Sequence, residues 1–307
     1  MTWEKIGNLF CPVQNFEWMN SHAANPVPYI LNNEKGIVRV FFTCRNANNV
    51  SHIGYTDIDF INNFKILKIS DFPVLGPGPL GTFDDSGAAM GYFIEKDNKF
   101  YIFYLGWNLK VTVPWLNSIG LAISDNIYGE FRKYSLAPLL DRSIEDPYSI
   151  SYPSILYENG IYKMWYGSNL SWGKDQSEMK HVIKYAESLD LIIWDRKNKI
   201  HIPLFHANEY AISKPWVIKE KDCYKMWYSY RGCNEISSYR IGYAESKNNI
   251  DWIRMDNKVG IDVSESGWDS EMICYPSVFT MNNTTYMLYN GNGYGKTGFG
   301  LAVLQSE

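Results

Sequence analysis

A short strand pattern recurs five times along the chain. Each copy is a variant of the phrase Ile-Gly-Tyr-Ala, in which large side chains alternate with small ones. The copies begin at Ile53, Ile119, Ile183, Ile241 and Phe299, so they lie 66, 64, 58 and 58 residues apart. Such alternation is typical of β-strands, and a repeat of this length has room for several of them. The pattern therefore predicts a radial arrangement of similar units, a β-propeller.

Three further strand patterns complete each repeat. The one directly before the recurring phrase is rich in aromatic residues, as in Tyr162–Tyr166 and Tyr224–Tyr228, and the one before that usually carries a proline, as in Tyr152–Leu156. A pattern with tryptophan follows the phrase, as in residues 193–196 and 251–254. These residue types favour strands. The repeat thus predicts an all-β fold with five blades of four antiparallel strands each.

The two ends of the chain complement each other. The last repeat stops at Leu304, after its third strand, whereas the chain opens with Thr2–Ile6, which resembles the tryptophan-containing fourth strand. We expect the N-terminal strand to close the last blade, because an unpaired sheet edge invites aggregation. The prediction is one five-bladed propeller domain over residues 1–307.

The composition agrees with one large domain and narrows its partners. With 307 residues and 46% hydrophobic content, the chain can bury a sizeable core. The net charge of −4 without a basic cluster predicts no nucleic-acid partner. The sequence has neither a run of 18 apolar residues nor a signal-peptide pattern, so we expect no membrane partner and a cytoplasmic location. The five cysteines lack Cys-x-x-Cys spacing, so neither a zinc site nor a disulfide framework is predicted. No cofactor and no dedicated metal-ligand loop is expected, and whether a metal fills the axial channel stays open. The oligomeric state stays open.

The repeat also indicates where a site would lie. In a propeller, residues just before the first strand and just after the second strand of each blade converge on a central funnel. Candidates before the first strands are His22, Asn25, Asp84, Asp85, Glu145, Glu271 and Tyr275. Candidates after the second strands are Arg45, Trp107, Asn108, Trp172, Arg231 and Asn290. Carboxylates and amides bond to sugar hydroxyls and aromatic faces stack on sugar rings, so the predicted partner is a carbohydrate or a sugar-containing small molecule.

Several phrases of the chain resemble known proteins. Phe83–Gly87, Met164–Tyr166, Tyr243–Ser246 and Tyr289–Gly295 are similar to phrases in a group of uncharacterised, glycosidase-like bacterial proteins of similar length. The five four-stranded blades resemble the propeller glycosidases of glycoside hydrolase families 32, 43, 62, 68 and 130. The resemblance covers essentially the whole chain. It implies the propeller fold and a carbohydrate-active enzyme that is glycoside hydrolase-like.

The match to the catalytic acids of family 43-like enzymes is incomplete. Those enzymes carry an aspartate base on the first blade, a second aspartate on the next and a glutamate acid on the third. Asp85, or its neighbour Asp84, matches the second position. Asn25 replaces the first aspartate, and Ser151 stands where the glutamate would be, with Glu145 six residues upstream. An ordinary family 43-type acid and base pair is therefore not expected.

One hypothesis is a glycoside hydrolase-like enzyme with rearranged catalysis. His22 would act as base or proton relay, because the ordinary pKa of histidine is near neutrality. Asp85 would position the substrate, and Glu145 or Glu271 would act as the acid. His22 is the only histidine that the repeat itself places at the funnel.

Two other hypotheses involve no hydrolysis. The funnel could bind a glycan without cleaving it, or the protein could be a transferase or phosphorylase that acts on an activated sugar in surface-glycan biosynthesis. Arg45 and Arg231 would hold phosphate in a family 130-like phosphorolysis. Two acids, Glu187 and Glu245, recur at one position of the repeat and are expected to make a structural hydrogen bond instead. The glycine-rich segment 290–293 is expected to form a tight loop near the funnel.

Overall fold

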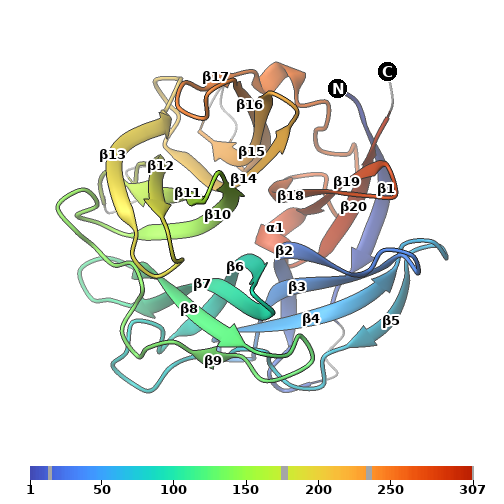
Figure 1. Ribbon diagram of the computed structural model, residues 1–307, viewed down its shortest axis with the longest axis horizontal. Helices are drawn as coiled ribbons and strands as arrows, with labels where there is room; N and C mark the ends of the chain where they lie inside the picture. Colours follow the sequence, from blue (N-terminus) through green and yellow to red (C-terminus); the bar gives the residue numbers. More distant parts are fainter. Residues whose placement is uncertain (13–15, 174–178, 233–236, 306–307) are drawn as a thin grey trace.

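The computed structural model describes residues 1–12, 16–173, 179–232 and 237–305. These residues form an all-β structure in which the sheets are arranged around a common centre (Figure 1). The only helical elements of the described chain are the short turns η2 (Asp256–Lys258) and α1 (Asn292–Gly295). The all-β prediction is confirmed. No described helix is long and apolar enough to span a membrane.

Consecutive strands pair as antiparallel meanders. The first two meanders consist of β2 (Ser21–Asn32), β3 (Ile37–Arg45), β4 (Ser51–Asp59) and β5 (Lys65–Ile69), and of β6 (Gly87–Lys96), β7 (Lys99–Leu109), β8 (Trp115–Ser124) and β9 (Arg132–Lys133). The next two consist of β10 (Ile150–Glu158), β11 (Ile161–Asn169), β12 (His181–Ser188) and β13 (Asp195–Ile202), and of β14 (Ala211–Glu220), β15 (Cys223–Arg231), β16 (Arg240–Ser246) and β17 (Ile253–Arg254). The last consists of β18 (Cys274–Met281), β19 (Thr284–Asn290) and β20 (Phe299–Leu304), joined by β1 (Trp3–Phe10). The recurring Ile-Gly-Tyr-Ala phrase lies in the third strand of each meander.

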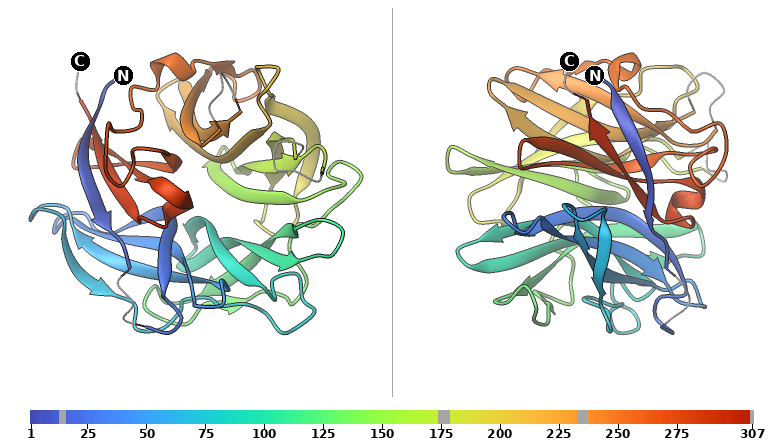
Figure 2. Two further views of the ribbon diagram at one scale, coloured as in Figure 1. Left: turned by 180° about the vertical axis from the view of Figure 1, so that it is seen from behind. Right: turned by 90° about the vertical axis from the view of Figure 1, so that its right-hand side faces the viewer.

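The N-terminal strand completes the last meander, as predicted. β1 pairs antiparallel with β20, with Trp3 opposite Leu304 and Phe10 opposite Phe299. The two ends of the chain therefore lie close together (Figures 1 and 2). Trp3 is buried and packs edge-on against Trp227, with ring centroids 6.2 Å apart. This first strand thus contributes to the core as well as to the sheet.

The first strands of the meanders surround the centre. β2 contacts β6, β6 contacts β10, β10 contacts β14, β14 contacts β18, and β18 contacts β2 again. Figure 1 shows these strands facing the middle of the ring. The apolar core lies between neighbouring sheets, where Trp165, Tyr166 and Trp227 are almost completely buried. Side chains that point from the first strands toward the centre are therefore the ones that can form a site.

A bulge recurs in these first strands at the residue before the proline. Asn25, Tyr152, Lys214 and Tyr275 have φ angles of 53°, 39°, 51° and 55°, and the register of β2, β10, β14 and β18 shifts at the same place. Positive φ is uncommon for residues with a side chain, and residues before proline are normally extended. Bulges re-aim side chains. Here they turn one side chain from each of these strands toward the centre.

In two repeats the tryptophan lies in the turn before the fourth strand. Trp194 and Trp252 lie just before β13 and β17, not inside them. Each indole donates a hydrogen bond to the carbonyl three residues earlier, Leu191 at 2.9 Å and Asn249 at 3.1 Å. Leu191 and Asn249 have φ of 72° and 59°. The predicted strands at residues 193–196 and 251–254 are therefore corrected to turns followed by strands.

Two predicted structural features are confirmed. Tyr185 donates to Glu187 at 2.9 Å and Tyr243 donates to Glu245 at 2.5 Å, which is the repeated hydrogen bond expected of these acids. The glycine-rich segment after β19 forms the tight turn α1, in which Tyr294 has φ of 59°. Tyr294 lines the central cavity described below. The acids that recur in the repeat thus make structural hydrogen bonds, whereas Tyr294 contributes to the central cavity.

Candidate functional site

A cavity of about 370 Å³ lies at the centre of the ring. Its lining comes from the first strands, from the ends of the second strands, from the beginnings of β8 and β12 and from the turn α1. The sequence-based candidates among the lining residues are His22, Asn25, Arg45, Trp107, Arg231 and Tyr275. Six of the sequence-based candidates therefore converge on one cavity, together with further polar and aromatic side chains.

The bulged residues form one part of the lining. Asn25, Tyr152 and Tyr275 all face the cavity, and the rings of Tyr152 and Tyr275 lie 5.7 Å apart. The Asn25 backbone N–H donates to Asn290 Oδ1 at 2.8 Å, and its Nδ2 donates to Thr43 Oγ1 at 3.4 Å. The Asn25 Oδ1 atom is buried and accepts no hydrogen bond from any described residue. It is an acceptor available to a ligand hydroxyl.

Asn290 supports this arrangement from behind. It is fully buried, does not line the cavity, and donates from Nδ2 to the carbonyls of Ala23 at 2.7 Å and Gly298 at 2.9 Å. Because its Oδ1 holds the Asn25 backbone, Asn290 acts on the cavity through Asn25. The structure therefore places this candidate in a positioning role.

The ends of the second strands supply two arginines at equivalent positions. Arg45 is the last residue of β3 and Arg231 is the last residue of β15, and both line the cavity. Arg231 is 2% exposed, donates to the Tyr294 hydroxyl at 2.7 Å and lies over the Tyr239 ring, 4.4 Å from its centroid. Packing of this kind fixes the orientation of a guanidinium.

Two histidines line the cavity as neutral groups. Burial lowers the pKa of His22 to about 4, and the charges of Arg45 and Lys296 act in the same direction. Burial lowers the pKa of His181 to about 3, with the charge of Arg231 adding to the effect. His22 Nδ1 lies 2.9 Å from the Ser21 hydroxyl, whereas His181 Nδ1 is buried without a partner among the described residues. Near pH 7 both rings can accept or donate one hydrogen bond.

No carboxylate of the described chain lines the cavity. Asp85 accepts hydrogen bonds from the Gly81 backbone at 3.0 Å and the Ser86 hydroxyl at 3.1 Å, which is the geometry of a turn. Its neighbour Asp84 is 1% exposed and accepts from the Tyr104 hydroxyl at 2.9 Å and from Lys133 at 2.6 Å. The structure thus places both aspartates outside the lining.

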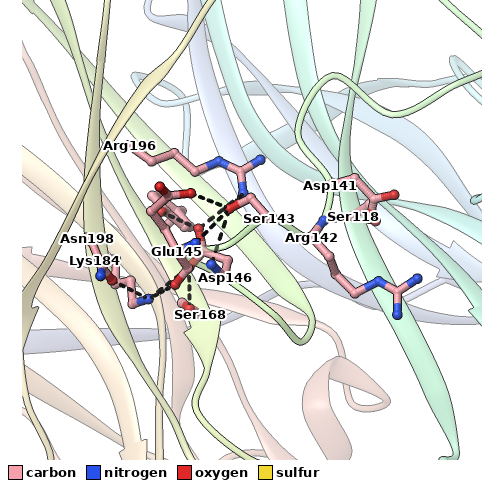
Figure 3. A network of polar contacts seen from close by, with 11 residues as sticks. Ser118, Asp141, Arg142, Ser143, Glu145, Asp146, Ser168, Lys184, Arg196 and Asn198 are labelled. Atoms are coloured by element: carbon pink, nitrogen blue, oxygen red, sulfur yellow. Dashed lines mark hydrogen bonds and ion pairs between the residues drawn. The ribbon is translucent and has the colours of Figure 1, made fainter.

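Glu145 also lies outside the cavity, within a polar network (Figure 3). It accepts from the Ser143 hydroxyl at 2.7 Å, and this hydrogen bond lowers the pKa of its carboxyl. The buried member of the network is the next residue, Asp146, which is paired with Lys184 at 3.1 Å and Arg196 at 3.2 Å. Figure 3 shows the two cations approaching Asp146 from different sides.

Glu271, Asn108 and Trp172 are the remaining candidates outside the lining. Glu271 is exposed, and its backbone N–H donates to Asn292 Oδ1 at 2.8 Å. Asn108 donates to the Thr82 carbonyl at 3.4 Å. Trp172 packs edge-on against Trp115, with centroids 5.4 Å apart. Because Trp115 itself lines the cavity, Trp172 supports the lining without belonging to it.

The position of Asp84 has equivalents elsewhere in the ring. Asp146 accepts from the Tyr166 hydroxyl at 2.8 Å, and Asp269 accepts from the Tyr289 hydroxyl at 3.0 Å, just as Asp84 accepts from Tyr104. In every case the tyrosine follows the aspartate by 20 residues. A contact that recurs in several meanders serves the fold, so Asp84 has a structural role.

Sequence reasoning missed several lining residues. His181 is the first residue of β12, Trp115 is the first residue of β8, and Tyr239 directly precedes β16. Positions at the start of third strands were not considered as part of the funnel. Tyr152 occupies the same place before a proline as Asn25 and Tyr275, so the repeat itself gives its position.

The lining is suited to a polar ligand with flat apolar faces. Aromatic rings, an amide, serine hydroxyls, neutral imidazoles and two guanidinium groups surround one space. Such a set can stack on a sugar ring and bond to its hydroxyls. Among the described residues, no group of three or more His, Cys, Asp or Glu side chains is arranged to hold a metal ion.

Comparisons of the sequence with known proteins identify two relatives. No family model matches the sequence. The chain is 42% identical over 306 residues to uncharacterised proteins of Mycobacterium tuberculosis strains H37Rv and CDC 1551, with 100% of each chain covered.

Solved structures with similar folds are glycoside hydrolases. One has a TM-score of 0.77 and 13% identity, over 99% of this chain and 92% of that one. A family 130 protein has a TM-score of 0.74 and 14% identity, over 99% and 93%. A thermostable family 43 glycoside hydrolase has a TM-score of 0.68 and 18% identity, over 95% and 93%. At these identities the likeness shows the fold, which is that of the glycoside hydrolase-like β-propellers and confirms the predicted resemblance.

Proposed function

The chain belongs to the same family as the two Mycobacterium tuberculosis proteins, and we propose that it is a single-domain, five-bladed propeller that handles carbohydrate in its central cavity. The five blades are supported by the closed cycle of contacts among the first strands and by the pairing of β1 with β20. The glycoside hydrolase-like fold supports a carbohydrate-active function.

The observation that carries the proposal is the chemistry of the lining. Asn25 Oδ1 and His181 Nδ1 are buried polar atoms without partners among the described residues, and both residues line the cavity. Buried polar groups are almost always hydrogen-bonded, so two unpartnered atoms at one cavity indicate a ligand with several hydrogen-bonding groups. Tyr152, Tyr275 and Trp115 provide the flat faces beside them.

Ordinary two-acid hydrolysis is not part of the proposal. It requires two carboxyl groups about 6.5–9.5 Å apart for inversion, or about 5–5.5 Å for retention. The described lining provides neither pair. We therefore assign Asp85, Glu145 and Glu271 no direct contact with the sugar.

A second candidate function is glycosyl transfer or phosphorolysis with histidine as the proton carrier. His22 favours it by its position, because its ring lines the cavity and is neutral near pH 7; a substrate that raises its lowered pKa of about 4 would make it a stronger proton acceptor. The two arginines would then bind a phosphate of the activated sugar or an attacking phosphate.

Sugar binding is tested with a thermal-shift screen followed by calorimetry. Monosaccharides, oligosaccharides, sugar phosphates, uronic acids and nucleotide sugars are screened, because a ligand that binds the native state raises the melting temperature. Trp115→Leu removes an aromatic face of the cavity and should weaken binding of the hit about tenfold, equivalent to about 1.4 kcal/mol. Trp194→Leu, a half-buried tryptophan outside the cavity, is the control and should leave the affinity unchanged.

Variants of the acids complete the test. Asp85→Asn, Glu145→Gln and Glu271→Gln should each retain the affinity of the wild type. Equal weakening by Trp115→Leu and Trp194→Leu, or loss of binding in these acid variants alone, would contradict a site in the central cavity. A failure of every sugar in the screen would remove the carbohydrate function itself.

A further inference from the structure

Among the described residues, the Arg45 guanidinium has no counter-ion at the wall of the cavity. No described residue forms an ion pair or hydrogen bond with its side chain. Lys296 acts on the same histidine as Arg45, and His22 itself is uncharged near pH 7. This wall of the cavity therefore carries a positive potential that the described residues do not compensate.

Arg231 supplies a second guanidinium to the same cavity, and aromatic rings surround it. Its position at the end of β15 is equivalent to that of Arg45 at the end of β3. The rings of Tyr210, Tyr239 and Tyr294 surround it at 5.2, 4.4 and 5.8 Å. These ring contacts orient the guanidinium.

The charge of each arginine acts on a tyrosine that lines the cavity. The Arg45 charge acts on the Tyr152 hydroxyl, and the Arg231 charge acts on Tyr275. The two tyrosine rings lie 5.7 Å apart. A sugar that stacks on these rings would therefore lie in the electric field of both guanidinium groups.

From this arrangement we propose that the sugar is anionic and that its carboxylate or phosphate group binds Arg45. The inference rests on the proposed function, because it names the chemical class of the sugar in the same cavity. Guanidinium pairs with carboxylate and phosphate through parallel hydrogen bonds, whereas neutral hydroxyls leave its charge uncompensated. Uronic acids and sugar phosphates share this chemistry.

Calorimetry on the full chain compares matched sugars. The probes are glucose, galactose and mannose, their uronic acids, their 1-phosphates, and inorganic phosphate alone. For at least one sugar, the charged form should bind about tenfold tighter than its neutral parent or better, and the difference should shrink as salt is added. Whether the uronic acid or the phosphate binds more tightly identifies the source of the charge.

Variants of Arg45 locate the effect. Arg45→Met should abolish the difference between charged and neutral sugars, and Arg45→Lys should restore part of it, because lysine keeps the charge but not the planar fork. Arg132→Met, which removes an exposed arginine on β9, is the matched control and should preserve the difference. If Arg45→Met does not fold, the salt dependence of the wild type provides the test.

Four results would overturn the inference. Neutral sugars that bind as tightly as their charged forms would leave the proposed function intact but remove the anionic substrate. A preference for charged sugars that persists in Arg45→Met would remove the assignment to Arg45. Inorganic phosphate that binds as tightly as the sugar phosphates would show an anion site without a sugar. Absence of binding by all probes would overturn both the inference and the proposed function.

Discussion

The buried aspartates just before three of the first strands differ from the charged side chains at the cavity in how their charges are paired. Asp84, Asp146 and Asp269 each accept a hydrogen bond from a tyrosine and pair with at least one cation. At the cavity, Arg45 has no acceptor among the described residues. Both sets lie within the same repeated framework, so the difference is not imposed by the fold.

The difference teaches how to separate stability from function in a repeat protein. A buried acid that recurs with the same partners has its charge compensated inside the protein, and removing it should harm folding. A cation that the chain leaves uncompensated gains little for the fold, and removing it should harm binding. The following experiments challenge this distinction.

The largest effect is expected for Asp146→Asn. This change leaves Lys184 and Arg196, whose side chains are 5% and 13% exposed, without their buried acid. Breaking a buried ion pair on one side destabilises by about 3–5 kcal/mol. The free energy of unfolding is measured by urea denaturation. Asp195→Asn, which removes an acid that is 68% exposed, is the control and should change it by less than about 1 kcal/mol. A similar loss in both variants would contradict the structural role of Asp146.

A second effect concerns Lys214, which is fully buried at the centre and donates to the Gly91 carbonyl at 3.3 Å. Burial lowers the pKa of its amine from 10.5 to about 7. Between these values the unfolded chain binds the proton more tightly than the folded one, so stability should rise as pH increases from 7 to 9.5. We expect a rise of about 3 kcal/mol.

Lys214→Met tests this assignment. The variant lacks the titrating amine, so it should be more stable than the wild type at pH 7 and show a flatter dependence of the unfolding free energy on pH. Lys221→Met, at an exposed lysine that also has positive φ, is the matched control and should keep the wild-type slope. Parallel pH profiles for the wild type and Lys214→Met would show that the buried amine titrates normally.

A third, smaller effect should appear in acid. The folded-state pKa of His181 is about 3, below its ordinary value of 6.5, because burial disfavours the charged ring. The unfolded chain therefore takes up the proton first, and stability should fall as pH drops from 6.5 toward 4, by at most about 1.4 kcal/mol per pH unit for this histidine. In His181→Gln this contribution is lost, so the acid slope of the unfolding free energy becomes shallower. An unchanged slope would contradict the buried neutral state of His181.

The smallest effect on stability is expected for Arg45→Met. Because this guanidinium has no partner among the described residues, its removal should change the free energy of unfolding by less than about 1 kcal/mol. The same variant should lose the preference for anionic sugars. A loss of stability as large as that of Asp146→Asn would place Arg45 among the structural charges and erase the distinction.

The fold was predictable because strands are specified locally and repeatedly. The phrase at Ile53, Ile119 and Ile241 returns with the same apolar alternation. Five copies of one pattern identify a strand more securely than a single copy does. The fourth strands were harder to place. Their tryptophans, such as Trp194, serve the preceding turn through a hydrogen bond that no alternation pattern reveals.

The site was predictable only where the repeat fixes the direction of a side chain. Arg45 and Arg231 end equivalent strands, and Asn25 and Tyr275 precede equivalent prolines, so all four were located. Loop acids such as Glu145 depend on how a connection folds, which local sequence does not determine.

The pairing of β1 with β20 also determines when the ring can be completed. Trp3 pairs with Leu304, so β1, the first strand to be synthesised, can pair only after β20 near the end of the chain has been made. At roughly 5–20 residues per second, this delay is on the order of tens of seconds. During that interval the apolar face of Trp3 lacks its final neighbours, and the most distant contact in the chain is among the last that can form. Translation must therefore be nearly finished before the last sheet gains its outer strand.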